Sequence, residues 1–299
     1  MTGYVRVRVP VAGLRELPVH AAPAPGRDPM QESQLLFNEV LAVRREQGEW
    51  LAVEALEQEK CVSGTWQGYP GWVQEKDVAP CDGPGMYNCV VQAAFTVVRA
   101  TPSAEGAAIF PLSLGTRLLL TEKARGFAGF AVEGGKTGWV AKGDVASMPA
   151  GGPVAGAEVA GLARLFVGTP YLWGGRSMPV PWAAGPPMGV DCSGLVNLAF
   201  RAVGIDVPRN AQDQCKKAAP IEAGALKAGD LVFLAKSGGA DPISHVLLYL
   251  GGGELIEAAE TGRAVCIRML SQGLGADLEG LAEGRAPGAV KKIYFGRIV

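Results

Sequence analysis

An internal repeat in the first half of the chain constrains its fold more than any other feature of the sequence. Residues 68–73 read Gly-Tyr-Pro-Gly-Trp-Val and are followed at 77–79 by Asp-Val-Ala. Residues 135–140 read Gly-Lys-Thr-Gly-Trp-Val and are followed at 144–146 by Asp-Val-Ala, with the same spacing. Short runs rich in Val and Leu, separated by Gly, Pro and Asn turns, precede each copy. Short strands in a duplicated unit predict two small β-barrels in succession.

The aromatic residues of the two copies are expected to differ in their surroundings. We expect Trp72 and Trp139 to pack in the cores, because large aromatic side chains are highly buried on average. Tyr69 stands immediately before a proline in a predicted turn. A turn at this position would leave the Tyr69 side chain exposed.

A change in composition separates the repeats from the rest of the chain. Residues 147–154 are rich in Pro and Gly, which predicts a linker. A chain of 299 residues is long enough for several domains. The predicted organisation is a first barrel at 1–82, a second barrel at 83–148, a linker at 149–156 and a third domain at 157–299.

The third domain begins with helical patterns and continues with strands. Val159, Leu162 and Phe166 predict a short helix that ends at Gly168. Helices followed by strands predict an α+β domain with an antiparallel sheet. The strand-like runs are 230–234, 245–250, 254–258, 265–269 and 290–299.

A single thiol stands where a helix is predicted to start. Leu195, Leu198, Ala199 and Ala202 have helical spacing, Asp191 is a good N-cap, and Gly204 marks the end. Cys192 would lie in the first turn, where unpaired amides and the helix dipole favour a negatively charged sulfur. The alternative is a buried core cysteine, the usual fate of a free thiol. A nucleophile also needs a base.

The candidate base and its partner flank a predicted hairpin. Three glycines at 251–253 separate two apolar runs, and His20 and His245 are the only histidines. Counting six residues either way from Gly251 reaches His245 and Glu257, which predicts cross-strand neighbours on one face. A slip of one residue would separate them. The alternatives are a hydrogen-bonded core histidine and a solvent-facing glutamate.

Together these residues predict nucleophilic catalysis by a thiolate–imidazolium pair. Cys192 would attack a carbonyl, His245 would protonate the leaving amine, and water would hydrolyse the thioester. Glu257 would orient the imidazole, and the Cys192 amide is a candidate oxyanion donor. This chemistry needs no cofactor. With two histidines and no Cys-x-x-Cys pair, we expect no metal site.

Composition and charge exclude some classes of binding partner and predict a cellular location. A net charge of −1 and a pI near 6.2 leave no basic footprint for nucleic acid. No apolar run reaches membrane-spanning length, and the N-terminus does not resemble a signal peptide. We therefore expect a cytoplasmic monomer that binds neither nucleic acid nor membranes, with its six cysteines as free thiols.

Five motifs follow one another in the third domain, at 168–175, 191–196, 208–214, 228–233 and 243–251. With these motifs the chain resembles the NlpC-type cysteine peptidases, which have a compact papain-like fold. The repeats are similar to bacterial Src-homology-3-like domains, and the combination resembles the γ-D-glutamyl-L-diamino acid endopeptidases. That subgroup recycles murein peptides, cleaving between γ-D-Glu and meso-diaminopimelate or L-Lys when the N-terminal L-Ala is free.

The resemblance implies a role for each matching residue. Cys192 matches the nucleophile and His245 the base. Asp191 matches the carboxylate that holds the substrate amine, and Ser193 matches a contact to the glutamyl group. The remaining implied contacts are groove-lining Tyr171 and Trp173, with Tyr69 and Glu32 of the first barrel closing the amine pocket.

Two positions depart from the family pattern. The third catalytic position, usually His and sometimes Asn or Gln, is Glu257, a carboxylate that can orient His245 and favour the ion pair. Ala211 replaces a serine found in several relatives and cannot make its hydrogen bond. The alternatives to a cytosolic peptidase of short murein peptides are a secreted wall endopeptidase, a catalytically silent wall-peptide binding module and an acyl- or amide-transferring relative.

Overall fold

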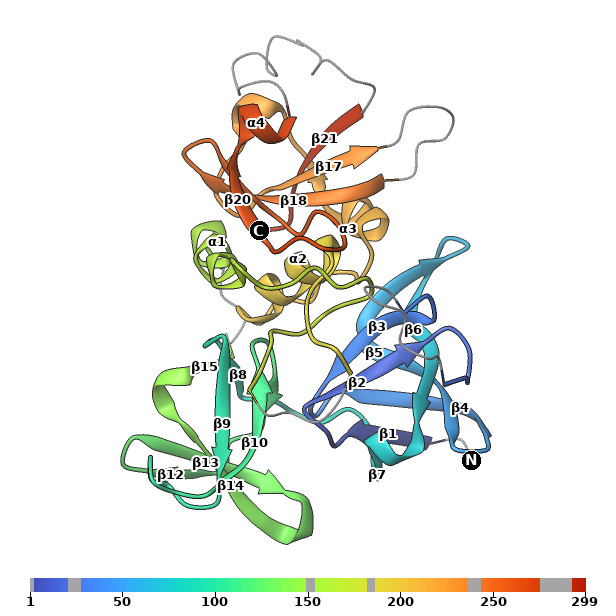
Figure 1. Ribbon diagram of the computed structural model, residues 1–299, viewed down its shortest axis with the longest axis vertical. Helices are drawn as coiled ribbons and strands as arrows, with labels where there is room; N and C mark the ends of the chain where they lie inside the picture. Colours follow the sequence, from blue (N-terminus) through green and yellow to red (C-terminus); the bar gives the residue numbers. More distant parts are fainter. Residues whose placement is uncertain (1–2, 21–27, 149–153, 182–185, 236–242, 275–291) are drawn as a thin grey trace.

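The computed structural model describes residues 3–20, 28–148, 154–181, 186–235, 243–274 and 292–299. Figure 1 shows three parts: a first unit with β1 to β7, a second unit with β8 to β15, and a third unit that contains the helices α1 to α4. Both strand-rich units lie on the same side of the third unit, next to α2. Most of the predicted linker, at 149–153, lies outside the described residues.

The first unit is one antiparallel sheet with the strand order β3-β2-β6-β5-β4-β1-β7. Its core contains Leu14, Leu41, Val53 and Val73. Strands β5 and β6 form a long hairpin, and the register of their pairing shifts between Ala55 and Glu59. The bounds are β1 Gly3–Val7, β2 Val11–Arg15, β3 Gln31–Leu36, β4 Val40–Gln47, β5 Trp50–Val62, β6 Thr65–Gln74, η1 Glu75–Asp77 and β7 Val78–Cys81.

The prediction for Tyr69 is wrong. Tyr69 lies inside β6 and is 3% exposed, because the strand continues through the predicted turn and pairs with Ala55. Pro70 adopts an extended conformation and is accommodated within the ladder opposite Glu54. Trp72 is buried as expected, whereas Trp139 is half-buried.

The second unit contains two small antiparallel sheets, ordered β10-β9-β14-β13-β12 and β11-β8-β15. Phe37 of the first unit inserts into its core, with ring centroids 5.1 Å from Phe110 and 6.1 Å from Phe130. The two units therefore pack against each other. The bounds are β8 Cys89–Val91, β9 Phe95–Arg99, β10 Ala108–Ser113, β11 Arg117–Leu118, β12 Glu122–Ala124, β13 Phe127–Val132, η2 Glu133–Gly135, β14 Lys136–Ala141, η3 Lys142–Asp144 and β15 Val145–Ser147.

The third unit has the predicted α+β arrangement. All pairs in its sheet, ordered β16-β21-β17-β18-β19-β20, are antiparallel. Strands form at every predicted run, and an additional helix, α3, forms in a polar segment. The bounds are α1 Gly156–Ala163, η4 Arg164–Phe166, α2 Cys192–Arg201, α3 Ala211–Lys217, β16 Ala219–Pro220, η5 Ala223–Ala225, β17 Leu231–Ala235, β18 Ile243–Gly251, β19 Glu254–Glu257, β20 Cys266–Met269, α4 Leu270–Leu274 and β21 Lys292–Arg297.

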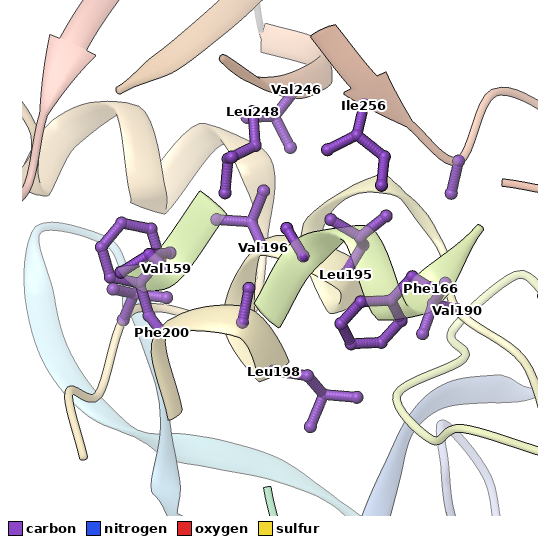
Figure 2. Packing of buried hydrophobic residues seen from close by; sticks show 14 of the residues in the cluster. Val159, Phe166, Val190, Leu195, Val196, Leu198, Phe200, Val246, Leu248 and Ile256 are labelled. Atoms are coloured by element: carbon purple, nitrogen blue, oxygen red, sulfur yellow. The ribbon is translucent and has the colours of Figure 1, made fainter. Parts of the chain in front are cut away.

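Helix α2 is the centre of the largest core. Figure 2 shows Val196 and Leu195 of α2 below Val246, Leu248 and Ile256 of the sheet. Every residue of α2 after Cys192 is buried, because the two strand-rich units cover the side that faces away from the sheet. A Cβ atom at Gly115 of the second unit would lie 3.0 Å from the Leu198 side chain.

A buried charge cluster joins the first and third units. The Glu39 carboxylate lies 2.6 Å from Arg176 and 3.6 Å from Arg201, and all three side chains are at most 1% exposed. Arg201 also lies 2.7 Å from Glu57. Burial alone would raise the pKa of Glu39, but the two guanidinium groups outweigh burial and lower it. Glu39 is therefore charged and holds two cations that have little access to water.

Glu39→Gln should destabilise the protein strongly. The substitution keeps the shape of the side chain but leaves Arg176 and Arg201 without their shared anion, and breaking a buried pair lowers the free energy of unfolding by about 3–5 kcal/mol. Urea denaturation measures the loss. The control is Glu133→Gln, which breaks an exposed pair with Arg8 and should change little. Equal losses in the two variants would contradict the role of the cluster.

Candidate active site

Cys192 occupies the first turn of α2, as predicted. Asp191 caps the helix, its Oδ1 accepting a hydrogen bond from the Gly194 amide at 2.7 Å. The backbone around Gly194 is closely packed, because a Cβ atom there would lie 2.1 Å from the Gly175 carbonyl oxygen. The Cys192 side chain is half-buried at this junction.

Arg209 binds both oxygens of the Asp191 carboxylate. Its Nη1 and Nη2 donate to Oδ1 and Oδ2 at 2.9 and 2.8 Å, and the Gly174 amide also donates to Oδ2 at 3.0 Å. A substrate ammonium would have to share this carboxylate with donors already in place. The capping role of Asp191 is confirmed, and its contact with a substrate amine stays a prediction. Arg209 was not assigned a role from the sequence, although it stands in one of the family-like motifs.

His245 and Glu257 meet on one face of the sheet, as predicted, but in a different register. Leu248 pairs with Ile256 and Tyr249 with Leu255, so the pairing is displaced by two residues from the predicted one. The reason is that the ladder shifts between Tyr249 and Gly251 rather than turning symmetrically about Gly251. A two-residue shift preserves the face. His245 Nε2 therefore still reaches Glu257 Oε2, at 3.0 Å.

The Cys192 thiol is a second group that raises the pKa of His245. Burial alone lowers the pKa of the imidazole, but the hydrogen bonds to Cys192 and Glu257 outweigh burial and raise it to about 9. The ring is thus held between sulfur and carboxylate and favours the protonated form. A base poised between a thiol and an orienting anion is the arrangement that thiolate chemistry requires.

Arg268 is a further member of the site that the sequence did not indicate. Its Nε lies 3.0 Å from Glu257 Oε1, so each carboxylate oxygen has a cationic or hydrogen-bonding partner. Glu257 pairs with Cys266 across the sheet, and Arg268 is two residues further along β20 on the same face. This cross-strand relation is visible only once the register is known.

The remaining residues with a predicted role fall into two groups. Ser193 is 6% exposed, and its hydroxyl donates to Asp191 Oδ1 at 3.1 Å and accepts from Arg209 Nη1 at 3.0 Å. Tyr171 is half-buried against the main core, and Trp173 is 42% exposed. Trp173 therefore presents an aromatic surface, whereas Ser193 belongs to the buried network beneath Cys192.

Glu32 and Tyr69 of the first unit contact each other. The Tyr69 hydroxyl donates to Glu32 Oε2 at 2.8 Å and also has a hydrogen bond with the Asn210 side chain. Arg209 interacts electrostatically with Asp191, Tyr69 and Cys192, and negative charge on any of these groups raises the pKa of its guanidinium. The pair is consequently next to the network that supports the nucleophile.

A helix-borne thiol and a strand-borne imidazole backed by a carboxylate define a papain-like cysteine peptidase site. The NlpC/P60 family model matches residues 168–277. The "Gamma-D-glutamyl-L-lysine dipeptidyl-peptidase" of Bacillus subtilis (strain 168) is 31% identical over 251 residues, covering 82% of this chain and 78% of the relative. The protein of that name from Bacillus cereus is 26% identical over 242 residues, covering 78% and 69%.

A crystal structure has the same overall fold. An NlpC/P60 family protein from Bacillus cereus ATCC 10987 superposes with a TM-score of 0.76 at 22% identity, covering 99% of both chains. The shared fold therefore includes the two strand-rich units. This chain belongs to the NlpC/P60 family and is a cysteine peptidase.

Other possible features are absent from the part of the chain that the structure describes. No helix there has the length and apolar character to cross a membrane. Nor do three or more His, Cys, Asp or Glu side chains gather in those residues as a metal site would require. All six cysteines are described, and each is a free thiol.

The pH dependence of activity should report the Cys192–His245 pair. Because the pKa of His245 is raised to about 9, kcat/KM should decline as pH rises through about 9. The stability that the imidazolium contributes is likewise complete below the ordinary histidine pKa and lost as pH approaches 9.

Glu257→Gln should move this alkaline limb toward neutral pH and lower kcat/KM by about tenfold or more, because one group that raises the histidine pKa is lost. The matched control is Glu260→Gln, which alters an exposed pair with Arg263. A pH profile of Glu257→Gln that coincides with that of the wild type would show that Glu257 does not tune the pair.

Proposed function

We propose that this protein hydrolyses the γ-D-glutamyl–L-diamino acid bond of short murein peptides whose N-terminal L-Ala is free. The observation that carries the proposal is the match to a γ-D-glutamyl-L-lysine dipeptidyl-peptidase over 78% of that protein, which extends beyond the catalytic domain. The hydrogen-bonded Cys192, His245 and Glu257 supply the chemistry.

In the proposed reaction, the Cys192 thiolate attacks the γ-glutamyl carbonyl carbon. The C–N bond breaks as protonated His245 gives its proton to the leaving amine of the diamino acid. Water then attacks the thioester, releasing L-Ala-γ-D-Glu and returning the proton to the Cys192–His245 pair. Glu257 orients the imidazole, and the Cys192 amide at the start of α2 faces the developing oxyanion.

Substrate contacts are proposed for both the first and the third units. Tyr171 and the exposed ring of Trp173 would line the groove, and Ser193 would support the glutamyl side through the Asp191 network. Asp191 would hold the free amine, and Glu32 and Tyr69 would close its pocket, because a carboxylate next to an aromatic face suits an ammonium group. A short peptide with a free end suits a groove whose Trp173 backbone is contacted by the first unit, where Gln31 Nε2 donates to the Trp173 carbonyl at 2.7 Å.

We further infer that the first and second units are Src-homology-3-like barrels, with domains at 1–82, 83–148 and 157–299. Short antiparallel strands, the repeated Gly-Trp-Val strands in β6 and β14, and the whole-chain superposition support this inference. A role in murein recycling, a cytoplasmic location and a monomeric state are also proposals.

The deciding experiment compares L-Ala-γ-D-Glu-L-Lys, its diaminopimelate counterpart and their N-acetylated forms, with chromatographic detection of the dipeptide product. We expect release of L-Ala-γ-D-Glu from the free-amine peptides and at least about tenfold lower kcat/KM for the blocked forms, because a charged contact is lost. Cys192→Ala should abolish release. If the wild type cleaves none of these peptides, the proposed function is wrong.

A further inference from the structure

A lysine of the first unit, Lys60, lies against both Glu32 and Tyr69. The Lys60 ammonium lies 3.9 Å from Glu32 Oε2 and 4.2 Å above the centroid of the Tyr69 ring. The Tyr69 hydroxyl donates to the same Glu32 oxygen, at 2.8 Å. One carboxylate and one aromatic face thus already surround an ammonium group that belongs to the protein itself.

This set of groups is chemically an ammonium site. An aromatic ring attracts a cation through its face, and a neighbouring carboxylate adds a direct charge interaction. The Tyr69 ring is fixed because the residue is 3% exposed inside β6. The side chains of Lys60 and Glu32 are 27% and 29% exposed, so solvent and small cations have access to the pair.

The strand that carries Lys60 is docked against the segment of the third unit that contains Arg209 and α3. The Glu59 carbonyl accepts a hydrogen bond from the Arg209 amide at 3.0 Å, and the Cys61 amide donates to Asp213 Oδ2 at 3.1 Å. Arg209 in turn holds Asp191, the residue before Cys192. Figure 1 shows β5 and β6 reaching toward α3. Lys60 is therefore placed by the contact between the first and third units and not by a loose loop.

We propose that Lys60 is a specificity-determining residue whose ammonium competes with the substrate's free N-terminus for the Glu32–Tyr69 site. This inference rests on the proposed function, since it assigns that site to the substrate amine. A free-amine peptide must displace Lys60, whereas a peptide without the amine gains nothing from the displacement. Lys60 thereby weakens the discrimination between free and blocked peptides.

The surroundings permit this displacement. A partly exposed ion pair is weak, so a second ammonium can replace the first. A cavity of about 550 Å³ beside Glu32 is lined by Lys60, by Glu16 and by Glu54, which is paired with Arg44. The displaced side chain has room there.

The test is Lys60→Met, which keeps the aliphatic stem and removes the charge. For L-Ala-γ-D-Glu-L-Lys we expect KM to fall about three- to tenfold with kcat unchanged, the range spanned by one weak ion pair and one cation–π contact. Both constants should stay unchanged for the N-acetylated peptide. Lys60→Arg should retain the wild-type ratio of kcat/KM values, and Lys76→Met, an exposed lysine of the same unit, is the control.

A double substitution separates competition from a structural effect. In a Glu32→Gln background only the Tyr69 ring is left to bind either ammonium, so adding Lys60→Met should lower KM for the free-amine peptide by a smaller factor than it does in the wild type. An unchanged ratio of free to blocked peptide in Lys60→Met would overturn the inference. So would an equal change for both peptides, because it would indicate an altered docking of the first unit.

Binding without turnover distinguishes failure of this inference from failure of the proposed function. Calorimetry with L-Ala-γ-D-Glu on Cys192→Ala, with and without Lys60→Met, should show about three- to tenfold tighter binding when Lys60 is removed. If the wild type cleaves no peptide but Lys60→Met tightens binding, the proposed reaction is wrong and the competition stands. Equal affinities, or no binding to either protein, would overturn the role of Lys60.

Discussion

The bidentate pair between Arg209 and Asp191 is the interaction on which the active site depends. The carboxylate caps the helix that carries Cys192, and the guanidinium also donates through Nε to Ser33 of the first unit at 2.8 Å. Both charges are buried, so each is stable only while the other is present. The position of the nucleophile and the docking of the first unit therefore depend on the same network. A substitution that disturbs one should also disturb the other.

The two buried charge networks join the first unit to the third. Glu39 with its two arginines repeats the same principle further along α2, where the first unit supplies the anion and the third unit supplies the cations. Such networks are costly when incomplete, which disfavours structures in which the units are separated. They fix the position of Glu32, Tyr69 and Lys60 of the first unit relative to the third unit, which carries Cys192.

Much of the third unit could be predicted because its signals are local. Helical spacing after Asp191 predicted α2, and the glycines at 251–253 predicted the hairpin. The contact between His245 and Glu257 was predicted for the right face but in the wrong register, since a ladder irregularity is not encoded in a simple count. Tyr69 was misplaced because a Tyr-Pro pair is typical of turns, yet strand pairing with Ala55 prevails.

The sequence by itself determined the types of group available: one thiol at a helix start, one histidine in reach, and a glutamate where relatives usually have another residue. These follow from short-range periodicity and spacing. Only the tertiary structure decided which charges meet. Asp191 with Arg209, Glu257 with Arg268 and Lys60 with Glu32 come from different elements, and burial together with strand register brings each pair into contact.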